Sequence, residues 1–149
     1  MATFQSLEEI EAWQKARGLT REVYIISNHG SFSRDFALRD QIRRASVSIM
    51  SNIGEGFERS GTAEFVQFLA MAKGSTGEVI SHIYVAADQG YITKEEADRL
   101  LGLAGETGRM IGGLMTYLRK SGIRGAKYKL ARNPKLAVHP KPETRNSKR

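Results

Sequence analysis

Residues 35–57 predict a helix with two apolar faces, and this pattern is the strongest constraint on how the chain folds. Apolar side chains at spacings of three and four form one stripe along this helix: Leu38, Ile42, Ala45, Ile49 and Ile53. A second apolar set lies outside that stripe: Val47, Met50 and Phe57. A helix that packs only within its own chain needs one stripe, so we expect the second set to form an oligomer interface.

Helical periodicity also extends over residues 7–28, 63–89 and 93–119, whereas strand signals are almost absent. The last of these segments begins with a capping box, in which Glu96 can reach back to the Thr93 amide. Gly90 ends the segment before it, and Gly30 is placed to end the first. Because the connections are short, neighbouring helices should be antiparallel. The expected fold is therefore all-α, an up-down-up-down four-helix bundle.

Five glycines lie inside the fourth helical segment: Gly102, Gly105, Gly108, Gly112 and Gly113. Glycine in a helix interior costs roughly 0.5–1 kcal/mol relative to alanine. Close approach of a neighbouring backbone is the usual compensation, so we expect tight helix packing here. The alternative is a frayed or kinked helix.

The basic charge of the chain belongs to its C-terminal end. The formal net charge of the whole chain is +7. Residues 1–119 contain 13 Lys and Arg against 15 Asp and Glu, a net charge of −2. Residues 120–149 contain 10 Lys and Arg against Glu143, a net charge of +9. We therefore expect a bundle over residues 1–121 and a basic, largely disordered arm over residues 122–149.

Composition and motifs exclude several classes of protein. The chain has no cysteine, which rules out disulfides and thiolate chemistry. The N-terminal segment lacks the pattern of a signal peptide, and no apolar run approaches the roughly 20 residues that span a bilayer. We therefore expect a cytoplasmic protein that does not enter a membrane.

No enzyme motif is present either. The three histidines, His29, His82 and His139, are scattered, and the repeated Glu-x-x-His pattern of di-iron bundles is absent. Gly54-Glu55-Gly56 resembles half of a phosphate loop, but it follows a helix rather than a strand. We expect no catalytic activity, no metal and no cofactor.

Polar residues near the end of the 35–57 helix have two interpretations. They are a polar site or a set of packing and pairing groups: Arg43, Arg44, Asn52, Glu55, Glu58 and Arg59. Arg59 lies four residues after Glu55, which is the spacing of a helical ion pair, and Asn52 is placed to cap or bridge helices. Pairing is the favoured interpretation.

The C-terminal arm is the candidate nucleic-acid-binding element. Its basic side chains neutralise phosphates and release counterions, and Tyr128 between two lysines is suited to stacking on an exposed base. The alternative is a solubilising tail. The expected nucleic-acid-binding residues are Lys120, Arg124, Lys127, Tyr128, Lys129, Arg132 and Lys135.

Residues 7–120 resemble a bacterial four-helix-bundle family named after the large-subunit ribosomal RNA intervening-sequence protein. The most specific block is Gln41-Ile42-Arg43-Arg44-Ala45 with Ser51-Asn52-Ile53-Gly54-Glu55-Gly56. Further matches are Trp13-Gln14-Lys15-Ala16-Arg17, Val23-Tyr24, Glu64-Phe65, Phe68-Leu69, Ala72-Lys73-Gly74-Ser75 and Gly90-Tyr91-Ile92. The resemblance implies an antiparallel bundle assembled as a homopentamer.

A related branch is similar to the accessory variability protein of diversity-generating retroelements, a basic pentamer that binds a reverse transcriptase and nucleic acid. The basic arm favours that branch, whereas the glycine-rich fourth helix departs from the core family. We therefore expect a homo-oligomeric scaffold that binds RNA or DNA. The alternative is a protein-interaction scaffold with no intrinsic affinity for nucleic acid.

Overall fold

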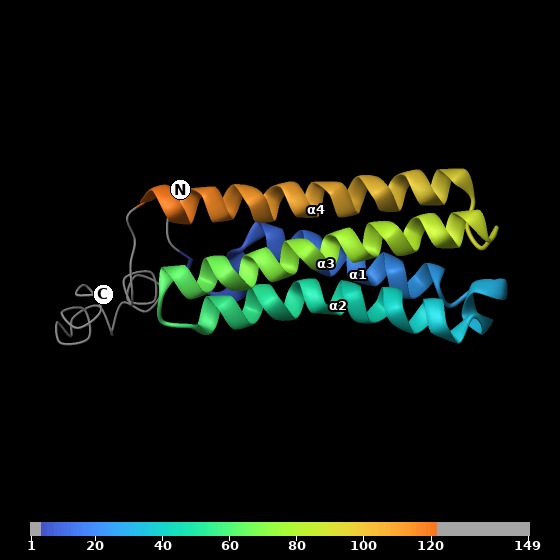
Figure 1. Cartoon of the computed structure of the whole chain (residues 1–149), viewed down its shortest axis with the longest axis horizontal. Helices are drawn as coiled ribbons and strands as arrows, with labels where there is room; N and C mark the ends of the chain where they lie inside the picture. The colour runs from blue at the N-terminus through green and yellow to red at the C-terminus, as the bar shows by residue number, and fades with distance from the viewer. Residues whose placement is uncertain (1–3, 122–149) are drawn as a thin grey trace.

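Four long helices lie side by side in the computed structural model, which describes residues 4–121 (Figure 1). The elements are a short 3-10 helix η1 (Leu7–Glu9), α1 (Glu11–Ile26), a second 3-10 helix η2 (Gly30–Arg34), α2 (Phe36–Glu58), α3 (Thr62–Asp88) and α4 (Lys94–Ser121). No strand occurs among these residues. The predicted all-α class is confirmed.

The helices are arranged as an antiparallel bundle in which α1 packs on α2 and α4, and α3 packs on the same two helices. Between α2 and α3, Gly56 lies against Phe68 while Ser48 lies against Ser75, so position increases along one helix as it decreases along the other. This is the up-down-up-down order expected from the short connections.

Local signals at the end of α3 and the start of α4 behave as predicted. The Glu96 amide donates to Oγ1 of Thr93 at 3.0 Å, and the Thr93 amide donates to Oε1 of Glu96 at 2.8 Å, which completes the capping box of α4. Gly90 follows α3 with φ of 74°, and its amide donates to the Ala87 carbonyl at 3.0 Å. Glycine adopts this left-handed conformation without steric penalty, so it ends α3 cleanly.

The first helix differs from its prediction at both ends. It was expected to be continuous over residues 7–28, but Ile10 adopts an extended conformation (φ −81°, ψ 110°) that separates η1 from α1. The Ile10 side chain is buried, and its carbonyl accepts the first hydrogen bonds of α1 from Trp13 and Gln14. At the other end Ser27 is the cap, and Gly30 begins η2 rather than ending α1.

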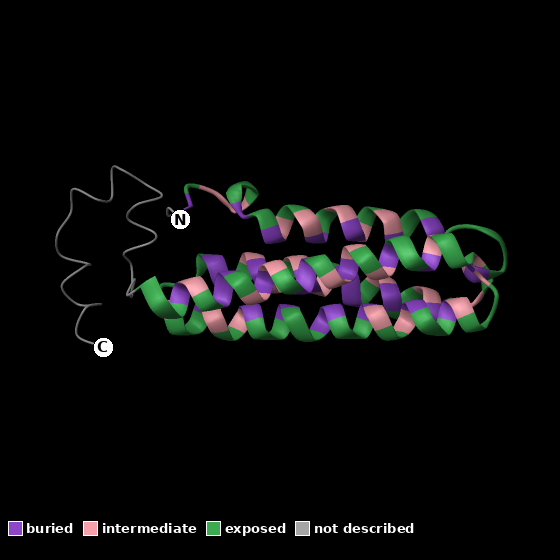
Figure 2. Cartoon of the chain, turned by 90° about the horizontal axis from the view of Figure 1, so that it is seen from above, coloured by how far each residue is buried: buried purple, intermediate pink, exposed green. Residues whose placement is uncertain are grey.

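The core lies between the four helices, and buried residues line their inward sides (Figure 2). All five residues of the predicted stripe on α2 are buried there. Phe57 was predicted to face another subunit, and that prediction is wrong because its side chain is only 1% exposed. Its ring packs edge-on against Phe65 of α3, with centroids 6.2 Å apart, so Phe57 contributes no surface to an interface.

Only one glycine of α4 has a tight neighbour, and that neighbour is a side chain rather than the backbone that was expected. A Cβ at Gly108 would lie 3.2 Å from Oγ1 of Thr76, whereas Gly102 and Gly113 would meet nothing outside the backbone of their own helix within 4 Å. α4 nevertheless runs unbroken over 28 residues. The tightest glycine contact is on α2, where a Cβ at Gly56 would lie 2.7 Å from Cβ of Phe68.

Candidate oligomer and nucleic-acid interfaces

The second apolar set on α2 is only partly available to a partner. Val47 is 40% exposed, so it is accessible on the outer side of α2. Met50 is half-buried and packs against the core. With Phe57 inside the bundle, Val47 and the accessible part of Met50 remain as the predicted interface on this helix.

Three arginines of α1 and α2 lie over aromatic rings. The Arg43 guanidinium on α2 lies 4.6 Å from the centroid of the Tyr24 ring on α1, and its Nε donates to Oγ of Ser27 at 2.8 Å. Arg17 lies 5.8 Å from the Trp13 ring, and Arg39 lies 4.8 Å from the Phe36 ring. Cation–π contacts of this kind hold a guanidinium in one orientation while leaving its charge accessible.

We define the α1–α2 face as the exposed and half-buried residues that surround these pairs. Its members are Trp13, Arg17, Tyr24, Phe36, Arg39, Asp40, Arg43, Val47 and Met50. Three arginines and one aspartate give the face a net charge of +2. It combines aromatic and arginine side chains, which are enriched at protein interfaces and also bind single-stranded nucleic acid.

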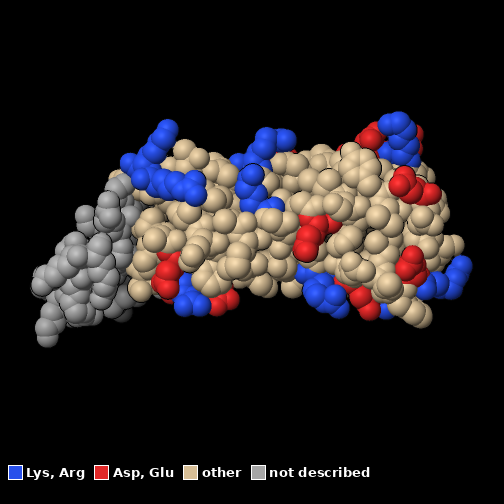
Figure 3. Space-filling model, viewed as in Figure 1, with Lys and Arg blue, Asp and Glu red and all other residues tan. Residues whose placement is uncertain are grey.

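The outer side of α3 has a different character. Between Phe65 and Ala87 only Lys73 and Glu78 are charged, and three large apolar side chains are exposed: Met71 (49%), Tyr84 (56%) and Val85 (43%). Figure 3 views the bundle from the side of α3, where much of the surface is uncharged and an acidic side chain lies near the middle. Exposed apolar side chains with few charges among them are typical of a protein interaction surface.

We define the α3 face as the exposed residues on this side of the helix. Its members are Gln67, Ala70, Met71, Gly74, Gly77, Glu78, Ser81, Tyr84, Val85 and Asp88. This face was not predicted from the sequence, because the periodicity of α3 was assigned only to the core. The signal was present, since a helix of 27 residues with so few charges is unlike an ordinary surface helix.

Glu55, Arg59 and Asn52, at the end of α2 and just after it, are used in pairing and packing. Nη2 of Arg59 donates to Oε2 of Glu55 at 3.0 Å, as the helical spacing predicts, and its guanidinium lies 5.0 Å from the Phe68 ring. Asn52 bonds within its own helix, because Nδ2 donates to the Ser48 carbonyl at 2.9 Å. The bridge to α3 is made by the Oγ atoms of Ser48 and Ser75, which are 2.9 Å apart.

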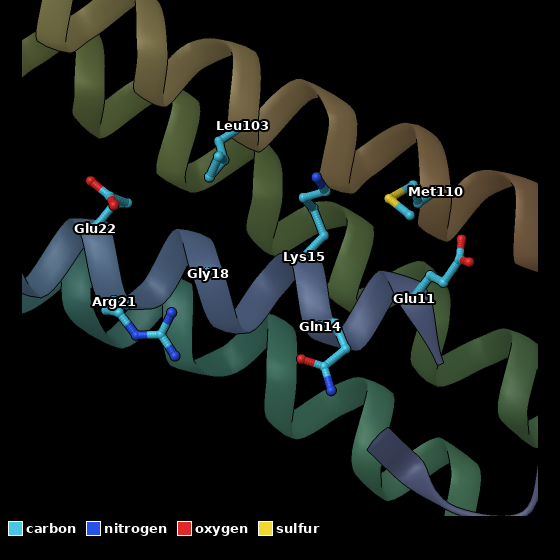
Figure 4. Close-up of a pocket in the computed structure, with 8 residues that line it drawn as sticks. All are labelled: Glu11, Gln14, Lys15, Gly18, Arg21, Glu22, Leu103 and Met110. Carbon is cyan, nitrogen blue, oxygen red and sulfur yellow. The ribbon is translucent and has the colours of Figure 1, made fainter. Parts of the chain in front are cut away.

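A shallow groove of about 560 Å³ lies between α1 and α4 (Figure 4). It is lined by Glu11, Gln14, Lys15, Gly18, Arg21, Glu22, Leu103 and Met110. Lys15 extends from α1 towards α4, and Nζ of Lys15 lies 3.4 Å from Oε1 of Glu106. Arg99 of α4 pairs with Glu22 at 2.6 Å. Because these ion pairs join the two walls, the groove is a site of helix packing.

Most of the predicted nucleic-acid-binding residues lie outside the described part of the chain. Lys120 is exposed in the last turn of α4. The others, at residues 124–135, follow the last described residue: Arg124, Lys127, Tyr128, Lys129, Arg132 and Lys135. Within residues 4–121, no group of His, Asp and Glu side chains is arranged to hold a metal ion. None of the helices in that range is both long and apolar enough to cross a bilayer.

Comparison with known proteins identifies one family. The model of the 23S rRNA-intervening sequence protein family matches residues 8–113. A solved structure from Bacteroides thetaiotaomicron, described as a protein of unknown function from the S23 ribosomal protein family, is similar with a TM-score of 0.64. Its sequence is 20% identical, and the match covers 70% of this chain and 97% of that one. A search of curated proteins finds no match.

Proposed function

The chain belongs to the 23S rRNA-intervening sequence protein family, and from this premise we propose that it is a homo-oligomeric scaffold that binds RNA or DNA through its C-terminal arm. The scaffold is non-catalytic and acts in the cytoplasm. The observation that supports this proposal is the separation of charge, −2 over residues 1–119 and +9 over residues 120–149. A body of that charge has little general attraction for phosphate, whereas the arm has a strong one.

Assembly should increase the affinity with which the arms bind nucleic acid. One arm that makes a few phosphate contacts binds weakly at physiological salt. Several arms on one scaffold engage the same strand together, because the first contact raises the effective concentration of the others. The family resemblance suggests five copies, and its retroelement branch suggests a reverse transcriptase as the enzyme that the scaffold holds near its nucleic acid.

A binding titration with a fluorescently labelled single-stranded RNA tests the proposal. Full-length protein is compared with a variant in which Lys127, Lys129, Arg132 and Lys135 are all replaced by Gln. The wild type should bind with an affinity that falls steeply with salt, and the variant should bind weakly with a shallower salt dependence. The slope of log affinity against log salt should change by about 0.7 for each phosphate that the variant no longer neutralises. Equal affinities would contradict the role of the arm.

The exposed α3 face favours a second candidate, a protein-interaction scaffold with no intrinsic nucleic-acid binding. Its uncharged surface is suited to a protein partner rather than to phosphate. In that case full-length protein has no measurable affinity for the RNA at low salt, whatever the sequence of the arm. The same titration therefore distinguishes the two candidates.

A further inference from the structure

The α3 face exposes more apolar surface than the fold of one chain requires. Met71, Tyr84 and Val85 are each more than two-fifths exposed, and they lie on one side of a single helix. Glu78 and Asp88 are the charged members of the α3 face and give it a net charge of −2. Lys73 is exposed at the edge of this face that adjoins α4, where a Cβ at Gly112 would lie 3.4 Å from its Cε, and with it the exposed side of α3 over residues 67–88 has a net charge of −1.

Two glycines on the same face have no explanation within the chain. A Cβ at Gly74 or at Gly77 would meet nothing beyond the backbone of α3 within 4 Å. Gly56 and Gly108 differ, because each is pressed against a side chain of α3. Glycine weakens a helix interior relative to alanine, so Gly74 and Gly77 destabilise the isolated chain without relieving any internal contact. Close approach of a second molecule would account for both.

The α1–α2 face has complementary properties. Its net charge is +2, and its arginines are already held against Trp13, Tyr24 and Phe36. Because stacking orders these guanidiniums in advance, less conformational freedom is lost when they meet a carboxylate. Val47 and Tyr24 contribute exposed apolar surface to the same face. An apolar patch that carries acidic groups, as the α3 face does with Glu78 and Asp88, is the surface that such a face fits.

The two faces point in different directions. α3 lies at the front of the view in Figure 1 with α1 behind it, and α2 and α4 separate them in the packing order. One chain can therefore use both faces at once. Because the faces are not equivalent, contact between them is heterologous, and repetition with a suitable rotation closes a ring.

We infer that the α3 face of one copy docks on the α1–α2 face of the next copy, and that this contact builds the assembly. The inference rests on the proposed homo-oligomeric function and specifies which surfaces meet. Opposite charge orients the contact, with Glu78 and Asp88 towards the arginine pairs. Apolar burial of Met71, Tyr84 and Val85 supplies most of its stability.

Two variants of the full-length chain test the contact, and each alters an exposed side chain that the fold of one chain does not need. Val85→Arg places a cation on the α3 face, where it opposes the arginines of the other copy. Val47→Glu places an anion on the α1–α2 face, where it opposes Glu78 and Asp88. Thr116→Arg and Thr116→Glu on the exposed side of α4 are matched controls.

Mass is measured by light scattering after size exclusion, with circular dichroism to verify folding. We expect wild type and both controls to share one oligomeric mass, and each face variant alone to approach the monomer mass of 16.6 kDa. Mixing the two face variants should produce a one-to-one pair, because each supplies the intact face that the other lacks. A symmetric contact between identical faces would not produce that pair.

The outcomes separate the two levels of the proposal. A monomeric wild type overturns the homo-oligomeric function together with the contact. An oligomeric wild type whose mass is unchanged by Val85→Arg or Val47→Glu, or a mixture that forms no pair, overturns the contact alone. If Val47→Glu keeps the wild-type mass but loses affinity for single-stranded RNA, the α1–α2 face binds nucleic acid, and the inferred contact is wrong.

Discussion

The Tyr91 hydroxyl donates to Oδ2 of Asp35 at 2.9 Å and so joins the turn after α3 to the residue that begins α2. The other oxygen of the same carboxylate, Oδ1, accepts from the Leu38 amide at 3.1 Å and caps α2. The Tyr91 ring also stacks on Phe32 of η2, with centroids 5.4 Å apart. The Asp35 carboxylate therefore joins the turn after α3 to the start of α2, and the Tyr91 ring adds η2 to this end of the bundle.

Stability should fall at high pH because of this pair. The hydrogen bond to Asp35, together with partial burial and the nearby negative charge, raises the pKa of Tyr91 above its usual value of 10.0. The folded state then holds the phenolic proton more tightly than the unfolded state. The contribution is complete below pH 10 and is lost as pH rises through the raised pKa.

Tyr91→Phe isolates that contribution from the titration of other groups. In urea unfolding at pH 8, the wild type should have a larger free energy of unfolding than Tyr91→Phe. This difference between the two proteins should shrink as the pH rises from 10 to 11. If the difference stays constant between pH 8 and pH 11, the pKa of Tyr91 is not raised by folding, and the prediction is wrong.

Gly56→Ala should destabilise the fold even though alanine is the better helix former. The added Cβ would lie 2.7 Å from Cβ of Phe68 and 2.9 Å from Cδ1 of Phe65, so α2 and α3 have to separate. Overpacking of this kind costs about 1–3 kcal/mol. Gly113→Ala is the matched control, because its Cβ meets nothing outside its own helix backbone, and it should stabilise the fold by about 0.5–1 kcal/mol. Chemical denaturation measures both, and equal effects would contradict the steric explanation.

Gly56 also shows which features of this fold can be predicted from the sequence and which cannot. Periodicity in one helix identifies its buried side, which is why the stripe from Leu38 to Ile53 is predicted correctly. Local chemistry identifies helix ends, as with Thr93 and Glu96. Periodicity and capping do not predict which residues of another helix a given residue contacts. The need for glycine at position 56 therefore follows only from the position of α3 in the structure.

The misassignment of Phe57 and the missed α3 face have different reasons. Phe57 follows Ile53 by four residues, so it continues the stripe on α2, and its spacing alone already favoured the core position that it takes against Phe65. On α3, the apolar outer residues do not interrupt the inner pattern, so the helix is predicted correctly while its second surface is overlooked. The candidate site was therefore predicted at Val47 but not at Met71, Tyr84 or Val85.

Gly77→Ala should have opposite effects on folding and on assembly. In the Val85→Arg background, where the chain is expected to be monomeric, the alanine should raise the free energy of unfolding by about 0.5–1 kcal/mol. In the wild-type background the same methyl group should weaken association, because it separates the α3 face from the next copy. The two backgrounds are needed because assembly itself adds to apparent stability. Stabilisation with undiminished association would show that no second molecule approaches Gly77 closely.

Arg43→Lys should weaken the junction of α1 and α2 although it preserves charge. A lysine has no planar guanidinium to stack on Tyr24 while also donating to Oγ of Ser27. We expect a loss of about 1 kcal/mol in the free energy of unfolding, from the stacking and the hydrogen bond together. Thermal unfolding of the variant in the Val47→Glu background separates this effect from assembly. An unchanged unfolding free energy there would mean that charge alone matters at position 43.

Assembly and nucleic-acid binding should be coupled through the number of arms that reach one strand. Val47→Glu leaves residues 120–149 intact, so a short RNA that meets a single arm should bind this variant and the wild type equally. A longer RNA that spans several arms should bind the assembled wild type more tightly, by about 100-fold or more, because each bound arm raises the effective concentration of the next. Fluorescence anisotropy with RNAs of increasing length, at one fixed salt concentration, measures this divergence. If the two proteins bind long RNA equally, the arms act independently and the scaffold does not serve to combine them.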